Sequence, residues 1–133
     1  MADAVMQVDV VSPERVLFSG QATMVITRTL GGGEIAFLPG HAPFLAALTE
    51  NHTRITLDSG TVLDVAVHGG FVEVSHNKVS ILSDVAELGD QIDVNRALAA
   101  RERAEEALRR EHTVETEAAL NRAEARLSAA GRN

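Results

Sequence analysis

The sequence contains no cysteine, which excludes disulfide frameworks, zinc thiolate sites and thiol nucleophiles. Tryptophan and tyrosine are also absent, so the chain lacks the aromatic and basic surface on which nucleic acid bases stack. No apolar run approaches the roughly 18 residues that a membrane-spanning helix needs. We therefore expect any membrane association to pass through a partner protein.

The charges of the chain are distributed unevenly. The 133 residues carry a formal net charge of −7 at pH 7. Residues 1–90 hold 11 Asp and Glu against 4 Lys and Arg, whereas residues 91–133 hold 8 of each. The acidic excess of the first part argues against binding to a phosphate backbone there. Every cation of the second part is Arg, whose planar fork suits carboxylates and phosphates, although a solvated helix surface is the alternative interpretation.

Residues 6–83 predict short β-strands separated by turns. The segments are rich in Val, Ile, Thr and Phe, and residues 63–67 alternate Leu and Val with Asp and Ala. Such alternation places one face on a core and the other toward solvent. Residues 58–60 and 76–78 are the predicted hairpin turns, because Gly and Asn accept positive φ. Many short strands at close spacing predict a β-sandwich, with strands expected at 6–11, 15–18, 21–29, 34–38, 53–57, 62–67, 71–75 and 79–82.

The hydrophobic period changes near residue 90, where two amphipathic helices are predicted. Asp93 is the expected N-cap of the first helix, which runs to about residue 110. Thr113 is the expected N-cap of the second helix, and Gly131 suits the position just past its end. The connection near residues 111–112 is short enough to make the helices an antiparallel hairpin.

The apolar stripes of the two helices consist mainly of alanine, at positions 97, 100, 104 and 107 in the first and 123 and 130 in the second. Alanine lets helices approach closely but buries little apolar area, and burial contributes only about 25 cal/mol per Å². Short helices are also marginal on their own. We therefore expect the hairpin to pack weakly against the first domain and to be able to leave it. A permanently packed hairpin is the alternative.

Several motifs follow one another along the chain. They are VVSPE at 10–14, LFSG at 17–20, EIAFLPGHAP at 34–43, GGFVEV at 69–74, VSIL at 79–82, IDVNRA at 92–97 and RAEARL at 122–127. Together they resemble the epsilon subunit family of the bacterial F-type ATP synthase, the rotary, proton-translocating enzyme. Ala36 and the glycine run at 31–33 depart from the family pattern, which leaves the geometry of that loop open.

The resemblance implies a fold of the β + α class. It consists of an N-terminal β-sandwich of about ten strands at residues 1–87, followed by a C-terminal antiparallel two-helix hairpin at residues 88–133. The implied function is that of a non-catalytic rotor subunit of the central stalk. Such a subunit couples proton translocation to ATP synthesis and regulates ATP hydrolysis through its mobile helices. The implied location is peripheral, at the cytoplasmic face of the cell membrane.

The implied partners are the gamma subunit, the ring of c subunits and, when the helices extend, the alpha/beta hexamer. The loop Pro39, Gly40 and His41 is stiffened by proline and resembles the family's contact with gamma. Glu34 and the glycines before it resemble the contact with the c ring. Ordinary loops between strands are the alternative interpretation of both segments.

The resemblance also implies that ATP binds the folded hairpin as a regulatory ligand, with no cofactor required. Arg96 and Arg103 lie two helical turns apart on one face, and Arg122 and Arg126 share a face in the same way. In a closed hairpin these guanidiniums can converge on phosphates, although salt bridges between the helices are the alternative. The full constellation is Glu87, Asp93, Arg96, Ala97, Arg103, Arg122 and Arg126.

Two other functions are the alternative hypotheses. A stand-alone ATP-sensing binding module would use the same arginines without any rotary partner. A β-sandwich hydrolase with His41 as its base is the third hypothesis, but the sequence offers no candidate nucleophile. The five histidines show no HxxH or HExxH spacing, so no metal site is expected.

Overall fold

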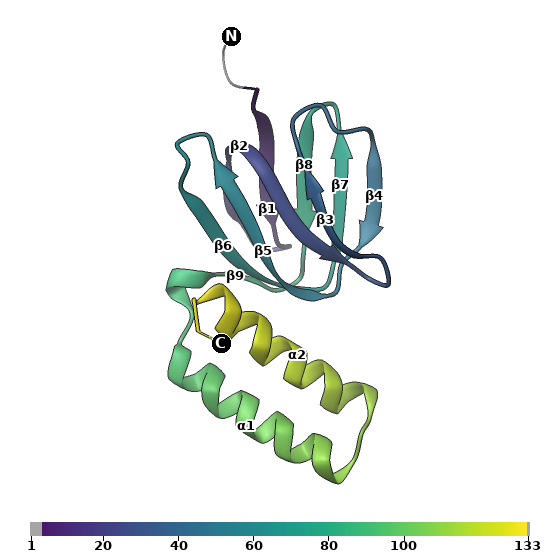
Figure 1. The fold of residues 1–133 in the computed structure, drawn as a ribbon, viewed down its shortest axis with the longest axis vertical. Helices are drawn as coiled ribbons and strands as arrows, with labels where there is room; N and C mark the ends of the chain where they lie inside the picture. Colours follow the sequence, from purple (N-terminus) through teal and green to yellow (C-terminus); the bar gives the residue numbers. More distant parts are fainter. Residues whose placement is uncertain (1–3, 133) are drawn as a thin grey trace.

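A computed structural model describes residues 4–132. Nine strands form the first domain, and a short 3₁₀ helix leads to two α-helices, as Figure 1 shows. The predicted fold class, a β-sandwich followed by a two-helix hairpin, is confirmed. The elements are β1 (Met6–Val11), β2 (Val16–Thr29), β3 (Gly33–Phe37), β4 (Phe44–Ala47), β5 (Glu50–Leu57), β6 (Val62–His68), β7 (Phe71–Ser75), β8 (Lys78–Leu82), β9 (Ala86–Leu88), η1 (Gly89–Gln91), α1 (Val94–Arg110) and α2 (Val114–Ala129).

The strands pair in the order β4-β7-β8-β1-β2-β5-β6-β9, and β3 joins the side of β2. The pair β1 and β8 is parallel, and the other pairs are antiparallel. The sheet folds over into the two layers seen in Figure 1, and the long strand β2 takes part in both. The predicted break within residues 15–29 was wrong, because Ser19 and Gly20 continue the ladder opposite Asp9 and Val8.

The hydrophobic core lies between the two layers. Its largest fully buried side chains include Phe37, Ile55 and Ile81. Among the described residues, every member of this contiguous core belongs to the strands or the turns between them, and none to α1 or α2. Three buried polar side chains, Thr27, Asn51 and Thr53, hydrogen-bond to one another, which satisfies their polar atoms.

The predicted turns and helix caps are confirmed. His76 and Asn77 have φ values of 52° and 61° in the turn between β7 and β8. Asp93 Oδ1 accepts a hydrogen bond from the backbone N–H of Arg96 at 3.1 Å, which caps α1. Thr113 and Thr116 form a reciprocal capping box at the start of α2. These local signals fix where both helices begin.

The hairpin docks mainly through α2. This helix packs against β5 and β6 on one side and against α1 on the other. Figure 1 shows the resulting order, with the sandwich first, α2 next to it and α1 outermost. Neither helix is both long and apolar enough to cross a membrane. The contact between α2 and the sandwich is therefore the one that decides whether the hairpin stays docked.

Candidate functional site

The platform beneath α2 is the outer face of β5, β6 and β9. Register pairs His52 with Ala66, and Ala66 with Glu87 on the next strand, so these side chains share one face. The opposite face of β6, with Val65 and Val67, belongs to the core. Ala66 is fully buried although it points away from that core. The platform is thus mostly polar, with one alanine at its centre.

The face of α2 that meets this platform is made of small residues. Ala125 and Ala129 are buried, and Ser128 lies between them. The backbone of Gly89 in η1 approaches the carbonyl group of Ala129 so closely that a β-carbon would clash with it. Alanine side chains contribute little burial energy, so specific polar contacts and this close backbone approach define the seam.

A pocket of about 380 Å³ opens where β9, η1 and both helices meet. Glu87 comes from β9, Asp93 caps α1, Arg96 and Arg103 project from α1, and Arg126 projects from α2. The lining is completed by Gln91, Ile92, Ala97 and Ala100. The structure therefore brings together six of the seven residues predicted for nucleotide binding.

Arg122 is the predicted residue that does not line this pocket. Its guanidinium donates instead to Glu115 Oε1 at 3.1 Å, on the same helix. It shares a helix face with Arg126, as the spacing predicted, but lies one turn further from η1. The shared face was predicted correctly, but the Arg122 side chain is held by Glu115, which lies toward the start of α2 and away from the pocket.

The carboxylate of Glu87 organises the pocket floor. Its Oε1 accepts from Arg126 Nε at 2.6 Å and from His68 Nε2 at 3.0 Å. The hydrogen bond from His68, followed by the bond and charge of Arg126, outweighs burial and lowers the pKa of Glu87 to about 2. Glu87 is therefore ionised at neutral pH. Sequence reasoning missed His68, which no motif or spacing marks.

The charge of the pocket suits an anionic ligand. Within residues 4–132, Arg96 and Arg103 form no ion pair with any carboxylate. Guanidinium groups bind phosphate oxygens through paired N–H donors. Two unpaired guanidiniums beside a carboxylate acceptor fit a molecule with phosphates at one end and hydrogen-bond donors at the other.

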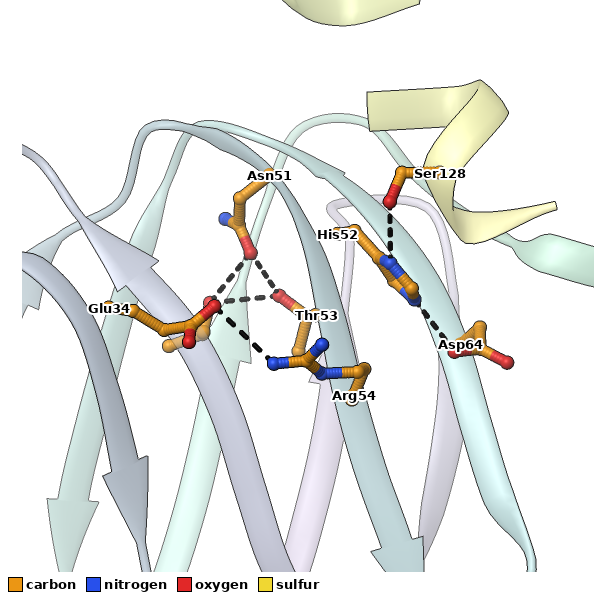
Figure 2. A network of polar contacts seen from close by, with 8 residues as sticks. Glu34, Asn51, His52, Thr53, Arg54, Asp64 and Ser128 are labelled. Atoms are coloured by element: carbon orange, nitrogen blue, oxygen red, sulfur yellow. Dashed lines mark hydrogen bonds and ion pairs between the residues drawn. The ribbon is translucent and has the colours of Figure 1, made fainter. Parts of the chain in front are cut away.

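A second polar cluster, shown in Figure 2, joins the sandwich to α2. The ring of His52 contacts Asp64 Oδ1 through Nε2 at 2.7 Å and Ser128 Oγ through Nδ1 at 2.8 Å. Although these are the residue types of a hydrolase triad, Ser128 lies within α2, whose backbone N–H groups are engaged along the helix and cannot form an oxyanion hole. The cluster is a structural contact, and no motif in the sequence marks it.

The predicted contact residues occupy opposite ends of β3. Glu34 stands at the start of the strand, where its carboxylate lies 3.4 Å from Arg54 on β5, as Figure 2 shows. Gly40 follows the end of the strand, and its N–H donates to Asn77 Oδ1 at 2.9 Å. These residues therefore face different regions around the sandwich, and their contact with partners stays a prediction.

His41 packs its ring edge against Phe37, with ring centroids 4.9 Å apart, and its Nδ1 donates to the carbonyl group of Ala42 at 2.7 Å. Among the described residues, no hydroxyl group hydrogen-bonds to this ring. The geometry gives a packed loop histidine and no nucleophile for it to activate.

Two family models match the chain in succession. The first, described as the ATP synthase Delta/Epsilon chain beta-sandwich domain, covers residues 5–89. The second, described as the ATP synthase Delta/Epsilon chain long alpha-helix domain, covers residues 90–131. The chain belongs to this family. The resemblance drawn from the sequence motifs is thereby confirmed.

Individual members of the delta/epsilon family agree with this assignment. The ATP synthase epsilon chain of Brevibacillus brevis is 52% identical over 103 residues, which are 77% of each chain. That of Desulfitobacterium hafniense strain DCB-2 is 46% identical over 124 residues, 91% of this chain and 92% of the relative. This chain therefore spans most of the length of these relatives.

Solved structures share the fold. A chain of the Euglena gracilis mitochondrial ATP synthase, from a structure described as OSCP/F1/c-ring, superposes with a TM-score of 0.82 at 22% identity and covers 97% of this chain and 82% of its own. A chain of the Tetrahymena thermophila mitochondrial ATP synthase, described as central stalk/c-ring, gives a TM-score of 0.55 at 15% identity over 85% of this chain and 100% of its own. At these identities the likeness concerns the fold.

Proposed function

We propose that this chain is the non-catalytic epsilon subunit of the central stalk of an ATP synthase. The two family models, which together match residues 5–131 without a gap, are the observation that supports this most strongly. The chains of similar fold come from assemblies described as containing F1, the c-ring and the central stalk. In this role the sandwich binds gamma and the c ring at the cytoplasmic face of the membrane, and the subunit couples proton translocation to ATP synthesis.

In this proposal the helical hairpin is a mobile regulator of ATP hydrolysis. Docked on the sandwich, it leaves rotation free. Extended along gamma into the alpha/beta hexamer, it blocks rotation. The seam beneath α2 supports this, because its alanines and polar contacts can separate without exposing the hydrophobic core of the sandwich.

ATP is the proposed ligand of the pocket between β9, η1 and the helices. Phosphates would bind Arg96, Arg103 and Arg126, while Glu87 and Asp93 accept from the base or ribose. Because the pocket exists only when both helices are folded against η1 and β9, ATP stabilises the docked hairpin by mass action. No hydrolysis is expected.

The rotor role is tested by a pull-down assay and by a measurement of the ATPase rate. The purified chain should retain purified gamma, and its addition should change the ATPase rate of the soluble complex lacking epsilon. A chain that bound ATP but ignored gamma, and left that rate unchanged, would support the stand-alone ATP-sensing module instead.

The nucleotide role is tested by calorimetry of the full chain with ATP. Arg103→Ala and Arg126→Ala should each weaken binding, because each removes a cation of the pocket. Arg109→Ala is the matched control, since Arg109 lies on the surface of α1 in an exposed pair with Glu106. Absence of heat at millimolar ATP would remove the nucleotide site and leave the rotor role standing.

A further inference from the structure

A buried histidine stands directly behind the nucleotide pocket. The side chain of His68, at the end of β6, is only 4% exposed. Its backbone N–H donates to the carbonyl group of Val85 at 3.1 Å, which fixes the strand end beside β9. The backbone that carries this ring is therefore held within the sandwich.

The register of β6 and β9 aims this ring at the pocket. Glu87 pairs with Ala66, and residues two apart on a strand share a face. His68 is therefore the diagonal neighbour of Glu87 on the face that α2 covers. Its Nε2 lies 3.0 Å from Glu87 Oε1.

This contact is the only hydrogen bond of the His68 ring among the described residues. Nδ1 is buried and has no partner. Because a carboxylate only accepts, Nε2 is the donor in this contact, and Nδ1 stays unsatisfied. A buried polar atom without a partner destabilises a fold, so Nδ1 makes histidine unfavourable at this position. The contact of Nε2 with Glu87 is the interaction that favours histidine here.

Arg126, the second partner of Glu87, can also bind a phosphate. Arg126 donates to the same Oε1 at 2.6 Å, and it also lines the pocket beside Arg96 and Arg103. A phosphate entering the pocket attracts the Arg126 guanidinium. Without another donor, Glu87 would then lose its anchor and stand as a free carboxylate near an anionic ligand.

We propose that His68 is a positioning residue of the nucleotide pocket, which anchors Glu87 to the sandwich while Arg126 binds phosphate. This rests on the proposed nucleotide site. Both donors use Oε1 of Glu87, and Oε2 accepts no hydrogen bond from the described residues. Oε2 is thus the atom available to a donor on the ligand, an N–H of the base or an O–H of the ribose.

The electrostatics of the pocket agree with this role. The hydrogen bond from His68 is the largest cause that holds the pKa of Glu87 at about 2, ahead of the contact with Arg126. The other charged groups that line the pocket are Asp93, Arg96 and Arg103, all at or beyond the start of α1. His68 therefore lowers the pKa of Glu87 from the sandwich side.

The first experiment measures ATP affinity of full-length variants by calorimetry. His68→Leu removes the donor but keeps an apolar side chain in the buried site, and should weaken ATP binding about tenfold. His68→Gln restores an N–H near the position of Nε2 and should stay within about threefold of the unmutated chain. Circular dichroism and thermal melts check that each variant folds. Equal weakening in both variants would overturn the proposal.

The second experiment asks whether His68 acts through Glu87. In a Glu87→Gln background, His68→Leu should have little further effect on ATP affinity, because the anchored group is already gone. An undiminished tenfold effect in that background would contradict positioning and would indicate a general structural role.

The third readout needs no nucleotide. A carbon-13 NMR titration of the Glu87 carboxylate should give a higher pKa in His68→Leu than in the unmutated chain, and a low one in His68→Gln. Normal ATP binding together with an unchanged Glu87 pKa in His68→Leu would overturn the role of His68 alone. Absence of ATP binding by the unmutated chain would instead remove the nucleotide site on which the proposal rests.

Discussion

The interior of the sandwich and the seam beneath α2 contain different kinds of side chain. The interior holds Ile55, Val65 and Ile81, each with no exposed surface, and burial of such a side chain contributes about 1.5–3 kcal/mol. The seam holds Ala125 and Ala129, with polar contacts around them. The two regions therefore have separate stabilities, so the hairpin can leave while the sandwich stays folded.

The largest effect is expected in the interior. Ile55→Ala should lower the free energy of unfolding by about 2–5 kcal/mol, because it removes fully buried carbons and leaves a cavity. Chemical denaturation measures this loss. Val62→Ala, at a half-exposed site on the neighbouring strand, is the control and should change it by less than about 0.5 kcal/mol. Similar losses in both variants would erase the distinction between core and surface.

The next largest effect should come from crowding the seam. In Gly89→Ala, the new β-carbon meets the carbonyl oxygen of Ala129 and forces α2 away. Hydrogen exchange should speed up by roughly tenfold or more in residues 114–129 and stay unchanged in the core strands. Asp90→Ala, at the exposed neighbouring position, serves as the control. Unchanged protection of α2, or equal loss in the strands, would contradict separate stabilities.

Two arginines of α2 should differ in how much they stabilise the docked hairpin. Arg126→Ala removes the half-buried ion pair with Glu87 and should weaken docking by about 1 kcal/mol. Arg122→Ala removes a pair with the exposed Glu115 and should weaken docking by only a few tenths of a kcal/mol, since such pairs contribute about 0–1 kcal/mol. Hydrogen exchange rates of the α2 backbone amides, measured without nucleotide, report the loss of docking in each variant. A larger effect at Arg122 would mean that the seam has been located wrongly.

Acid should reveal the contacts of Glu87 with His68 and with Arg126. The pKa of Glu87 lies at about 2 in the folded chain, below the ordinary value of 4.5. A depressed folded pKa stabilises the fold fully above the ordinary pKa, and this contribution is lost as the pH falls from about 4.5 toward 2. The stability difference between the unmutated chain and Glu87→Gln should therefore shrink over that range in urea titrations. A difference that stayed constant down to pH 2 would show that Glu87 is not specially stabilised.

A small effect is expected at the second polar cluster. Ser128→Ala removes one neutral hydrogen bond to His52, which keeps its contact with Asp64. Docking should weaken by about 1 kcal/mol or less. Ala129→Gly is a comparison within the same turn, since it removes packing and adds helix flexibility. If Ser128→Ala released the hairpin completely, the polar cluster and not the alanine face would hold it.

Local rules predicted much of this fold. The turn at 76–78, the cap at Asp93 and the cap at Thr113 depend on side chains within a few residues, and all three are confirmed. The strands β4 and β9 were missed, because each is four residues or fewer and is defined by pairing with β7 and β6 far along the chain. Short segments without alternation carry no such signal in the sequence.

In the candidate site, too, local features were predicted from the sequence and long-range contacts were not. Helical periodicity correctly placed Arg96 and Arg103 on one face, and six of the seven predicted residues meet at one pocket. Periodicity alone could not tell that Arg122 pairs with Glu115 instead of lining the pocket. His52 and His68 were missed because their partners come from other strands or from α2, and only the register of the sheet brings them together.

The absence of native cysteine permits a direct test of hairpin mobility. Spin labels at Glu73→Cys on β7 and Glu102→Cys on α1, both exposed positions, report the distance between sandwich and hairpin. We predict a single distance in the docked chain and an added second distance in the Gly89→Ala variant, with the sandwich still folded. A single unchanged distance in that variant, lost only when the strands unfold, would contradict it.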